Sequence, residues 1–194
     1  MLERKTFLIK ERVGFLKLAD TFDIYDPVAG SKIGTAREVI SPLLKLVRLF
    51  ISKRLLPTTV EVREEQHDQP VLSIQRGFTL LRVQVTVRDR VGKVLGHFKS
   101  KLFSLGGGFH VIDGLDNAVA EIKGDWKRWN FRFLANDGTE LGKVTKKWAG
   151  LGQELFTSAD NYVIALDERR ALAPDLAALL LAAGLAIDTV YKEK

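Results

Sequence analysis

The sequence predicts a mainly β protein with two helices, folded as a closed antiparallel barrel around a hydrophobic C-terminal helix. Three observations lead to this fold class. Strand–turn–strand units recur along the chain, the strand candidates are too many for a small open sheet, and the last helix has no polar side. A single domain over residues 1–194 accommodates all of them.

The recurring unit is an alternating strand, a turn that contains Asp and Gly, and a return strand with an apolar residue next to Gly. It is seen in "TFDIYDPVAGSKIGTAREV", in "LLRVQVTVRDRVGKVLGHFKSKLF" and in "WNFRFLANDGTELGKVTKKW". Apolar residues at every second position, with Asn, Asp and Gly between the runs, are typical of β-hairpins. A glycine inside a return strand indicates a bend of the kind found in barrels.

About a dozen strand candidates lie between Thr6 and Glu38 and between Thr58 and Val163. An open sheet of that size would leave edges that pair with other molecules. Closure removes these edges, so a barrel is favoured.

A first helix is predicted over residues 42–56, in "SPLLKLVRLFISKRLL". Ser41 is a suitable N-cap and Pro42 suits the first turn. The helix would be amphipathic, with Lys45, Arg48 and Lys53 opposite a broad apolar face. We expect a surface helix laid on the barrel, in preference to a basic membrane-surface helix.

A second helix is predicted over residues 174–190. From Leu176 to Ile187 it carries no charge, hydroxyl or amide. These residues would extend about 18 Å as a helix, whereas a bilayer core is about 30 Å thick. The helix is therefore too short to span a membrane, and its alanines make it slim. A slim helix that is apolar on all sides is expected to fill the barrel.

Composition narrows the function. The chain has no cysteine, which excludes disulfides and thiolate metal sites, and its formal charge is +6, which favours anionic partners. His67, His97 and His110 lie in separate segments without ligand spacing, so we expect neither an enzyme nor a cofactor. The longest apolar run near the N-terminus is Phe7 to Ile9, which is far shorter than the core of a signal peptide. We therefore expect a cytoplasmic protein.

The stretches "WNFRFLANDGTELGKVTKKWAG" and "LFTSADNY", followed by "LLLAAGLAIDTVY", resemble phospholipid scramblase-related and LURP-one-related proteins of the tubby C-terminal-like superfamily. The resemblance implies a barrel of twelve strands around a central helix. It also implies an association with membranes, through phosphoinositide binding or calcium-dependent lipid movement.

The calcium segment of scramblases corresponds here to "SADNYVIALD". Asp160, Asn161 and Asp167 are its only side chains with suitable oxygens. Calcium takes about 6–8 oxygen ligands, so these three residues alone make a poor site, and no metal site is predicted.

The candidate site is a cationic surface on the hairpin from residue 123 to residue 147. Alternation places Arg128 and Arg132 on the face opposite Trp129, Phe131 and Phe133. We expect a non-enzymatic module that binds anionic phospholipid or phosphoinositide as a peripheral membrane protein. The alternative is a soluble scaffold for protein partners or, less favoured, nucleic acid, and genuine scramblase activity is a weaker third. The candidate anion-binding residues are Lys123, Lys127, Arg128, Arg132, Lys143, Lys146 and Lys147.

Overall fold

The computed structural model describes residues 1–12, 19–47, 50–51, 55–77, 83–101, 108–125, 129–146 and 161–191, with side chains described as far as Ile187. Twelve strands and two helices lie within these residues. The strands are β1 (Thr6–Glu11), β2 (Thr21–Tyr25), β3 (Lys32–Val39), β4 (Thr58–Glu64), β5 (Pro70–Arg76), β6 (Gln84–Asp89), β7 (Val94–Ser100), β8 (Gly108–Asp113), β9 (Ala118–Asp125), β10 (Asn130–Ala135), β11 (Glu140–Thr145) and β12 (Tyr162–Leu166). The helices are α1 (Pro42–Val47) and α2 (Pro174–Tyr191).

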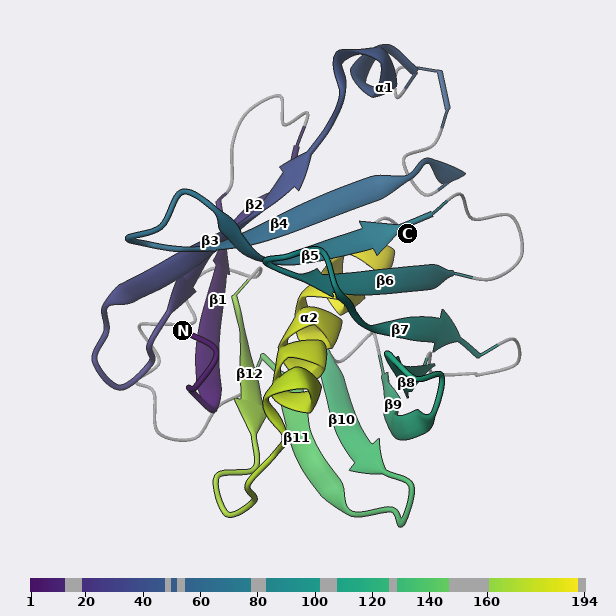
Figure 1. Ribbon diagram of the computed structural model, residues 1–194. Helices are drawn as coiled ribbons and strands as arrows, with labels where there is room; N and C mark the ends of the chain where they lie inside the picture. The colour runs from purple at the N-terminus through teal and green to yellow at the C-terminus, as the bar shows by residue number, and fades with distance from the viewer. Residues whose placement is uncertain are drawn as a thin grey trace.

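The strands form a closed antiparallel barrel (Figure 1). Each strand pairs with its neighbour in the sequence, and the barrel closes where β1 pairs with β12, with Phe7 opposite Ile164. The predicted fold class is therefore confirmed.

Aspartates close the hairpin turns. Asp89 Oδ1 accepts hydrogen bonds from the backbone N–H groups of Val91 and Lys93, at 3.0 and 2.9 Å. Asp113 Oδ1 accepts the equivalent pair from Leu115 and Asn117, at 2.9 and 2.8 Å. A short side chain that bonds the backbone ahead of it stabilises a tight turn, which explains why Asp recurs at these positions.

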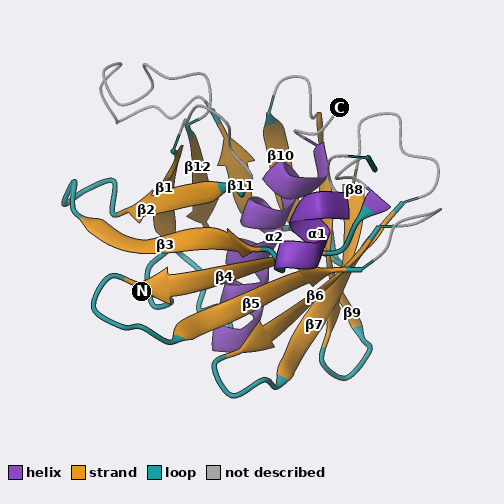
Figure 2. Cartoon of the chain, turned by 90° about the horizontal axis from the view of Figure 1, so that it is seen from above, coloured by secondary structure: helices purple, strands orange, loops and turns teal. Residues whose placement is uncertain are grey.

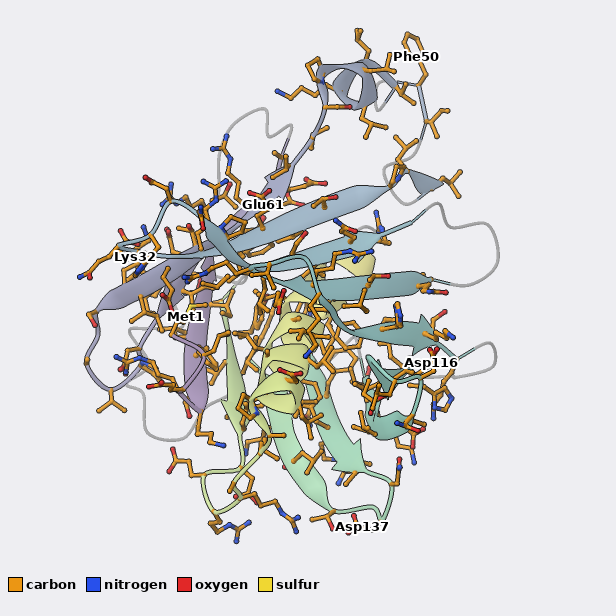
Figure 3. All side chains as sticks on the ribbon, viewed as in Figure 1. Met1, Lys32, Phe50, Glu61, Asp116 and Asp137 are labelled. Atoms are coloured by element: carbon orange, nitrogen blue, oxygen red, sulfur yellow. The ribbon has the colours of Figure 1, made fainter. Side chains whose placement is uncertain are left out.

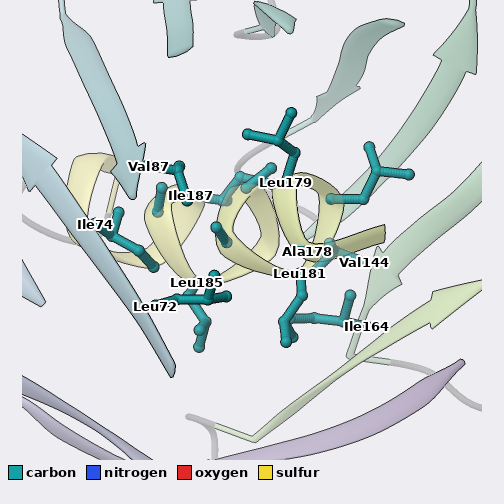
Figure 4. Close-up of a cluster of buried hydrophobic side chains, with 14 of the residues drawn as sticks. Leu72, Ile74, Val87, Val144, Ile164, Ala178, Leu179, Leu181, Leu185 and Ile187 are labelled. Carbon is teal, nitrogen blue, oxygen red and sulfur yellow. The ribbon is translucent and has the colours of Figure 1, made fainter. Parts of the chain in front are cut away.

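Helix α2 passes through the barrel and supplies much of its core (Figures 2 and 4). Leu180 and Ile187 are fully buried, and strand residues such as Leu72, Ile74 and Ile164 belong to the same cluster. The helix must be slim here, because a Cβ added at Gly184 would lie 2.5 Å from Ile164 Cδ1. The apolar surface of α2 is thus covered by the barrel wall, as the sequence predicts.

Among the described helices, none is long and apolar enough to cross a membrane.

Helix α1 differs from the expectation in length and in packing. The helix ends at Val47, short of the expected Leu56, although residues 48–49 and 52–54 lie outside the described residues. It has no buried residue and projects from the barrel between β3 and β4 (Figure 1). The expectation of a helix laid on the barrel is therefore wrong. In α1, Leu44 and Val47 are half-buried, while Leu43 and Leu46 are exposed.

The barrel has two distinct ends. In an antiparallel meander alternate connections lie at the same end, so the connections after β1, β3, β5, β7, β9 and β11 share one end, here called the α1 end. The connections after the even-numbered strands share the other, here called the turn end. Helix α2 begins at the turn end, where Lys93 Nζ lies 3.1 Å from Asp175 Oδ2. Phe50 and Asp137 mark the two ends (Figure 3).

Candidate functional site

Three cations lie side by side on the outer wall of the barrel. Arg132 of β10 is paired in register with Lys123 of β9 on one side and with Lys143 of β11 on the other. Residues at directly opposed positions of adjacent strands have Cβ atoms about 4.5–5.5 Å apart. All three side chains are exposed. Lys123, Arg132 and Lys143 are called the basic row below.

The alternation of the strands aims the basic row outward. Phe131 and Phe133, which flank Arg132, are fully buried, and so are Ile122 and Val144 on the neighbouring strands. The predicted separation of Arg132 from Phe131 and Phe133 is confirmed. Like charges at directly opposed positions repel, so the row is arranged at some cost to stability.

One carboxylate partly neutralises the row. Glu121 forms ion pairs with Lys123, at 3.0 Å, and with Lys101 of the connection after β7. Burial lowers the pKa of Lys101, and the nearby charge of Lys123 lowers it further. Within the described part of the chain, no carboxylate lies within ion-pairing distance of the Arg132 guanidinium. The row therefore carries a net positive charge.

A fourth cation, Lys146, lies at the α1 end just after β11. Its Nζ is 4.8 Å from the ring centroid of Trp129, and Trp129 packs against Tyr162 at 5.2 Å between centroids. The ammonium group of Lys146 is attracted to the ring face of Trp129, so the contact helps to fix its position. The structure thus brings Lys123, Arg132 and Lys143 together on the outer wall and places Lys146 at the α1 end just beyond β11, whereas Lys127, Arg128 and Lys147 lie outside the described residues.

The cavity beside Lys143 is a poor anion site. A cavity of about 580 Å³ adjoins Lys143, but Glu140, Asp167 and Glu168 line it together with Lys143 and Arg169. Three carboxylates would repel a bound phosphate. The row suits an extended anionic surface better than a single small anion.

The described candidate calcium ligands, Asn161 and Asp167, do not lie together. Asn161 precedes β12 and Asp167 follows it, so the strand separates them by about 20 Å. Asp167 also receives hydrogen bonds from the side chain and backbone of Arg169, and these lower its pKa. Asp160 lies outside the described residues. Among the residues described, no group of three or more metal-ligating side chains is found.

A second group of cations lies beside α1 and was not predicted from the sequence. A cavity of about 450 Å³, called the α1 hollow below, is lined by Arg37 of β3, Lys45 of α1 and Arg63 of β4, together with Glu38 and Glu61. Arg63 is paired with Glu61 at 2.7 Å. The signal was the outward position of Arg37 and Arg63 in their strands. Only the pairing of β3 with β4, which sets Arg37 opposite Glu61 and Arg63 opposite Thr35, shows that both line the same cavity.

A closed barrel of twelve antiparallel strands with an apolar helix through its centre and a cationic outer wall is the architecture of a tubby-like module. A comparison with protein-family models matches residues 28–194 to the Scramblase family, and the chain belongs to that family. The comparisons with curated proteins and with solved structures give no match. The resemblance seen in the sequence is confirmed at the level of family and fold.

Proposed function

We propose that this scramblase-related barrel is a non-enzymatic module that binds anionic phospholipid headgroups at a cytoplasmic membrane surface. The basic row is the observation that carries the proposal, because three exposed cations occupy directly opposed positions on three adjacent strands. Membership of the Scramblase family supports a lipid as the partner.

Binding is electrostatic and reversible. Each Lys or Arg close to an anionic membrane contributes about 1 kcal/mol, and the field decays over about 8 Å at physiological salt. Lys146 and the basic row together would therefore give a weak attraction of a few kcal/mol. Phosphatidylserine and phosphoinositides are the headgroups that supply the required charge.

Co-sedimentation with liposomes tests the proposal. The wild-type protein is expected to sediment with vesicles containing phosphatidylserine or phosphoinositide, and not with neutral vesicles. Binding should fall steeply as salt rises toward about 0.5 M, where the screening length is only about 4 Å.

A pair of charge-matched variants localises the effect. Changing Lys123, Arg132, Lys143 and Lys146 to Gln should strongly reduce binding. The same change at Arg90, Lys93, Arg169 and Arg170 removes equal charge from the turn end and should leave binding nearly intact. Equal sedimentation of the wild-type protein with acidic and neutral vesicles at low salt would refute the lipid proposal. A soluble scaffold for proteins or nucleic acid would then be the better candidate.

A further inference from the structure

The α1 connection presents large apolar side chains to solvent. Leu43 is 72% exposed, Leu46 is 61% exposed and Phe50 is 87% exposed. Phe50 lies at the far tip of the projection, away from the barrel (Figure 3). The chain returns to the core at Leu56, which is buried. Leu43, Leu46 and Phe50 are called the α1 tip below.

The α1 tip is a cluster, which distinguishes it from other exposed apolar residues. Val28, Val91 and Leu115 are also exposed, but they lie in three different turns at the turn end. Single exposed apolar residues are common on protein surfaces, whereas a contiguous group marks an interaction site.

The described charges differ between the two ends of the barrel. Among the residues that the structure describes, the connections of the α1 end hold four Lys or Arg against one Asp or Glu. Those of the turn end hold four against seven. The described connections are therefore positive at the α1 end and negative at the turn end, which favours an approach of the α1 end to an anionic surface.

We propose that the α1 tip inserts into the interfacial layer of an anionic lipid bilayer. Leu43, Leu46 and Phe50 enter the boundary between headgroups and acyl chains, while the α1 hollow holds Arg37 and Lys45 at the level of the lipid phosphates. Apolar side chains on a cationic element are the combination that interfacial membrane elements use. This inference rests on the proposed function and adds the orientation of the barrel and the residues that enter the lipid.

A second copy of the chain is a poorer occupant of the α1 tip. Twofold pairing through the tip would bring two α1 ends together, each with an excess of Lys and Arg among its described residues. The charges would repel across the contact. A bilayer with anionic headgroups offers both the apolar medium and the opposite charge.

The proposed orientation predicts which cations of the candidate site contribute most to membrane binding. With the α1 end toward the bilayer, Lys146 lies near the headgroups, whereas Lys143 is three residues, or about 10 Å, along β11 from it. That separation is about one screening length at physiological salt. Lys123 lies at the same level as Lys143, because Arg132 is paired with both. Lys146→Gln should therefore weaken binding to acidic vesicles more than Lys123→Gln does.

Site-specific labelling tests the insertion, because the chain has no cysteine of its own. A polarity-sensitive dye on Leu43→Cys, with Leu46 and Phe50 retained, should shift to the blue on vesicles with phosphatidylserine. Lipids with a nitroxide on the acyl chain should quench it. The same dye on Leu115→Cys, at the turn end, should show neither effect.

A substitution of the tip gives the second measurement. Phe50→Ser should weaken partition into acidic vesicles about tenfold, since a large apolar side chain no longer leaves water. Leu115→Ser, the matched control, should not weaken it.

The outcomes separate the two proposals. Sedimentation with acidic vesicles without a dye shift at Leu43→Cys refutes insertion and leaves headgroup binding standing. No sedimentation at all refutes both. A dimer in lipid-free solution that Phe50→Ser abolishes, seen by analytical ultracentrifugation, also overturns insertion, because the tip would then be a contact between copies.

Discussion

Asn161 and Asp167 lie at opposite ends of β12, with the five residues of the strand between them. Oxygens that bind one calcium ion lie about 2.3–2.6 Å from it, so these two side chains cannot share an ion. In addition, the carboxylate of Asp167 is held by Arg169 and lies 3.7 Å from Arg170.

We therefore expect no specific calcium binding. Titration calorimetry at millimolar calcium should give no saturable heat, and calcium should not shift the melting temperature. A saturable shift that Asp167→Asn removes would contradict this expectation.

Gly184 is expected to be required for the passage of α2 through the barrel. Gly184→Val places its first added carbon 2.5 Å from Ile164 Cδ1 and 2.7 Å from Ile164 Cγ1, closer than real Cβ contacts. Overpacking of this kind costs about 1–3 kcal/mol, or a few degrees in melting temperature for a domain of this size.

The double variant Gly184→Val with Ile164→Ala should recover part of the loss, because the shortened side chain makes room. Gly77→Val is the control, since a Cβ there meets no atom within 4 Å. Two results would contradict this close contact between Gly184 and Ile164. One is a Gly184→Val variant with the melting temperature of the wild type, and the other is a double variant that is less stable than Gly184→Val alone.

Arg132 is expected to lower stability while it serves binding. Arg132→Gln removes the middle charge of the basic row and should raise the free energy of unfolding by about 0.2–1 kcal/mol at low salt. The gain should shrink in high salt, and binding to acidic vesicles should fall in the same variant. Denaturant titration and co-sedimentation measure the two effects.

Arg12→Gln provides the matched control. Arg12 is also an exposed cation on the barrel wall, but its guanidinium donates two hydrogen bonds to Asp23, at 2.8 and 2.7 Å. Its loss should reduce stability. If the two substitutions change the free energy of unfolding equally, the cations of the basic row do not repel one another measurably.

Acid is expected to destabilise the protein below about pH 4. The hydrogen bonds from Arg12 hold the pKa of Asp23 below its ordinary value, and the backbone N–H of Asn117 does the same for Asp113. A carboxylate with a lowered pKa in the folded state contributes stability above its unfolded pKa of about 3.9 and loses it as the pH falls through the folded pKa.

The free energy of unfolding should therefore be nearly constant from about pH 7 to 5 and fall below about pH 4. Asp113→Asn should make that fall shallower, because the amide no longer titrates. A decline that starts near pH 6 would contradict this expectation.

The barrel and its central helix were predictable because they rest on local patterns. Alternation identifies the buried side of each strand, as Phe131 and Phe133 show, and Asp at the turns marks where strands reverse. A helix without charge from Leu176 to Ile187 is apolar on all sides, so it is expected to be buried in a closed interior. These signals all point to one arrangement.

The surroundings of α1 were not predictable because they depend on distant contacts. An amphipathic pattern shows which face is apolar but not whether a wall lies within reach, and here Leu43 and Leu46 face solvent. Arg37 and Arg63 were missed for a related reason, since they are 26 positions apart and come to line one cavity only through strand pairing. The partial neutralisation of Lys123 by Glu121 likewise becomes visible only in the folded strands.

The closure of the barrel has a consequence for how the protein is made. Phe7 of β1 has its partner, Ile164, in the last strand, and the core is empty until α2 follows. While a ribosome is still adding the middle strands, Phe22, Phe98 and Phe109 have their neighbours in the sheet but nothing to fill the interior. Contacts between such distant segments form slowly, and an incomplete sheet exposes unpaired strand edges that are prone to aggregation. We expect the nascent chain to depend on chaperones until β12 and α2 have emerged, so that synthesis rate and chaperone supply would limit the yield of native protein.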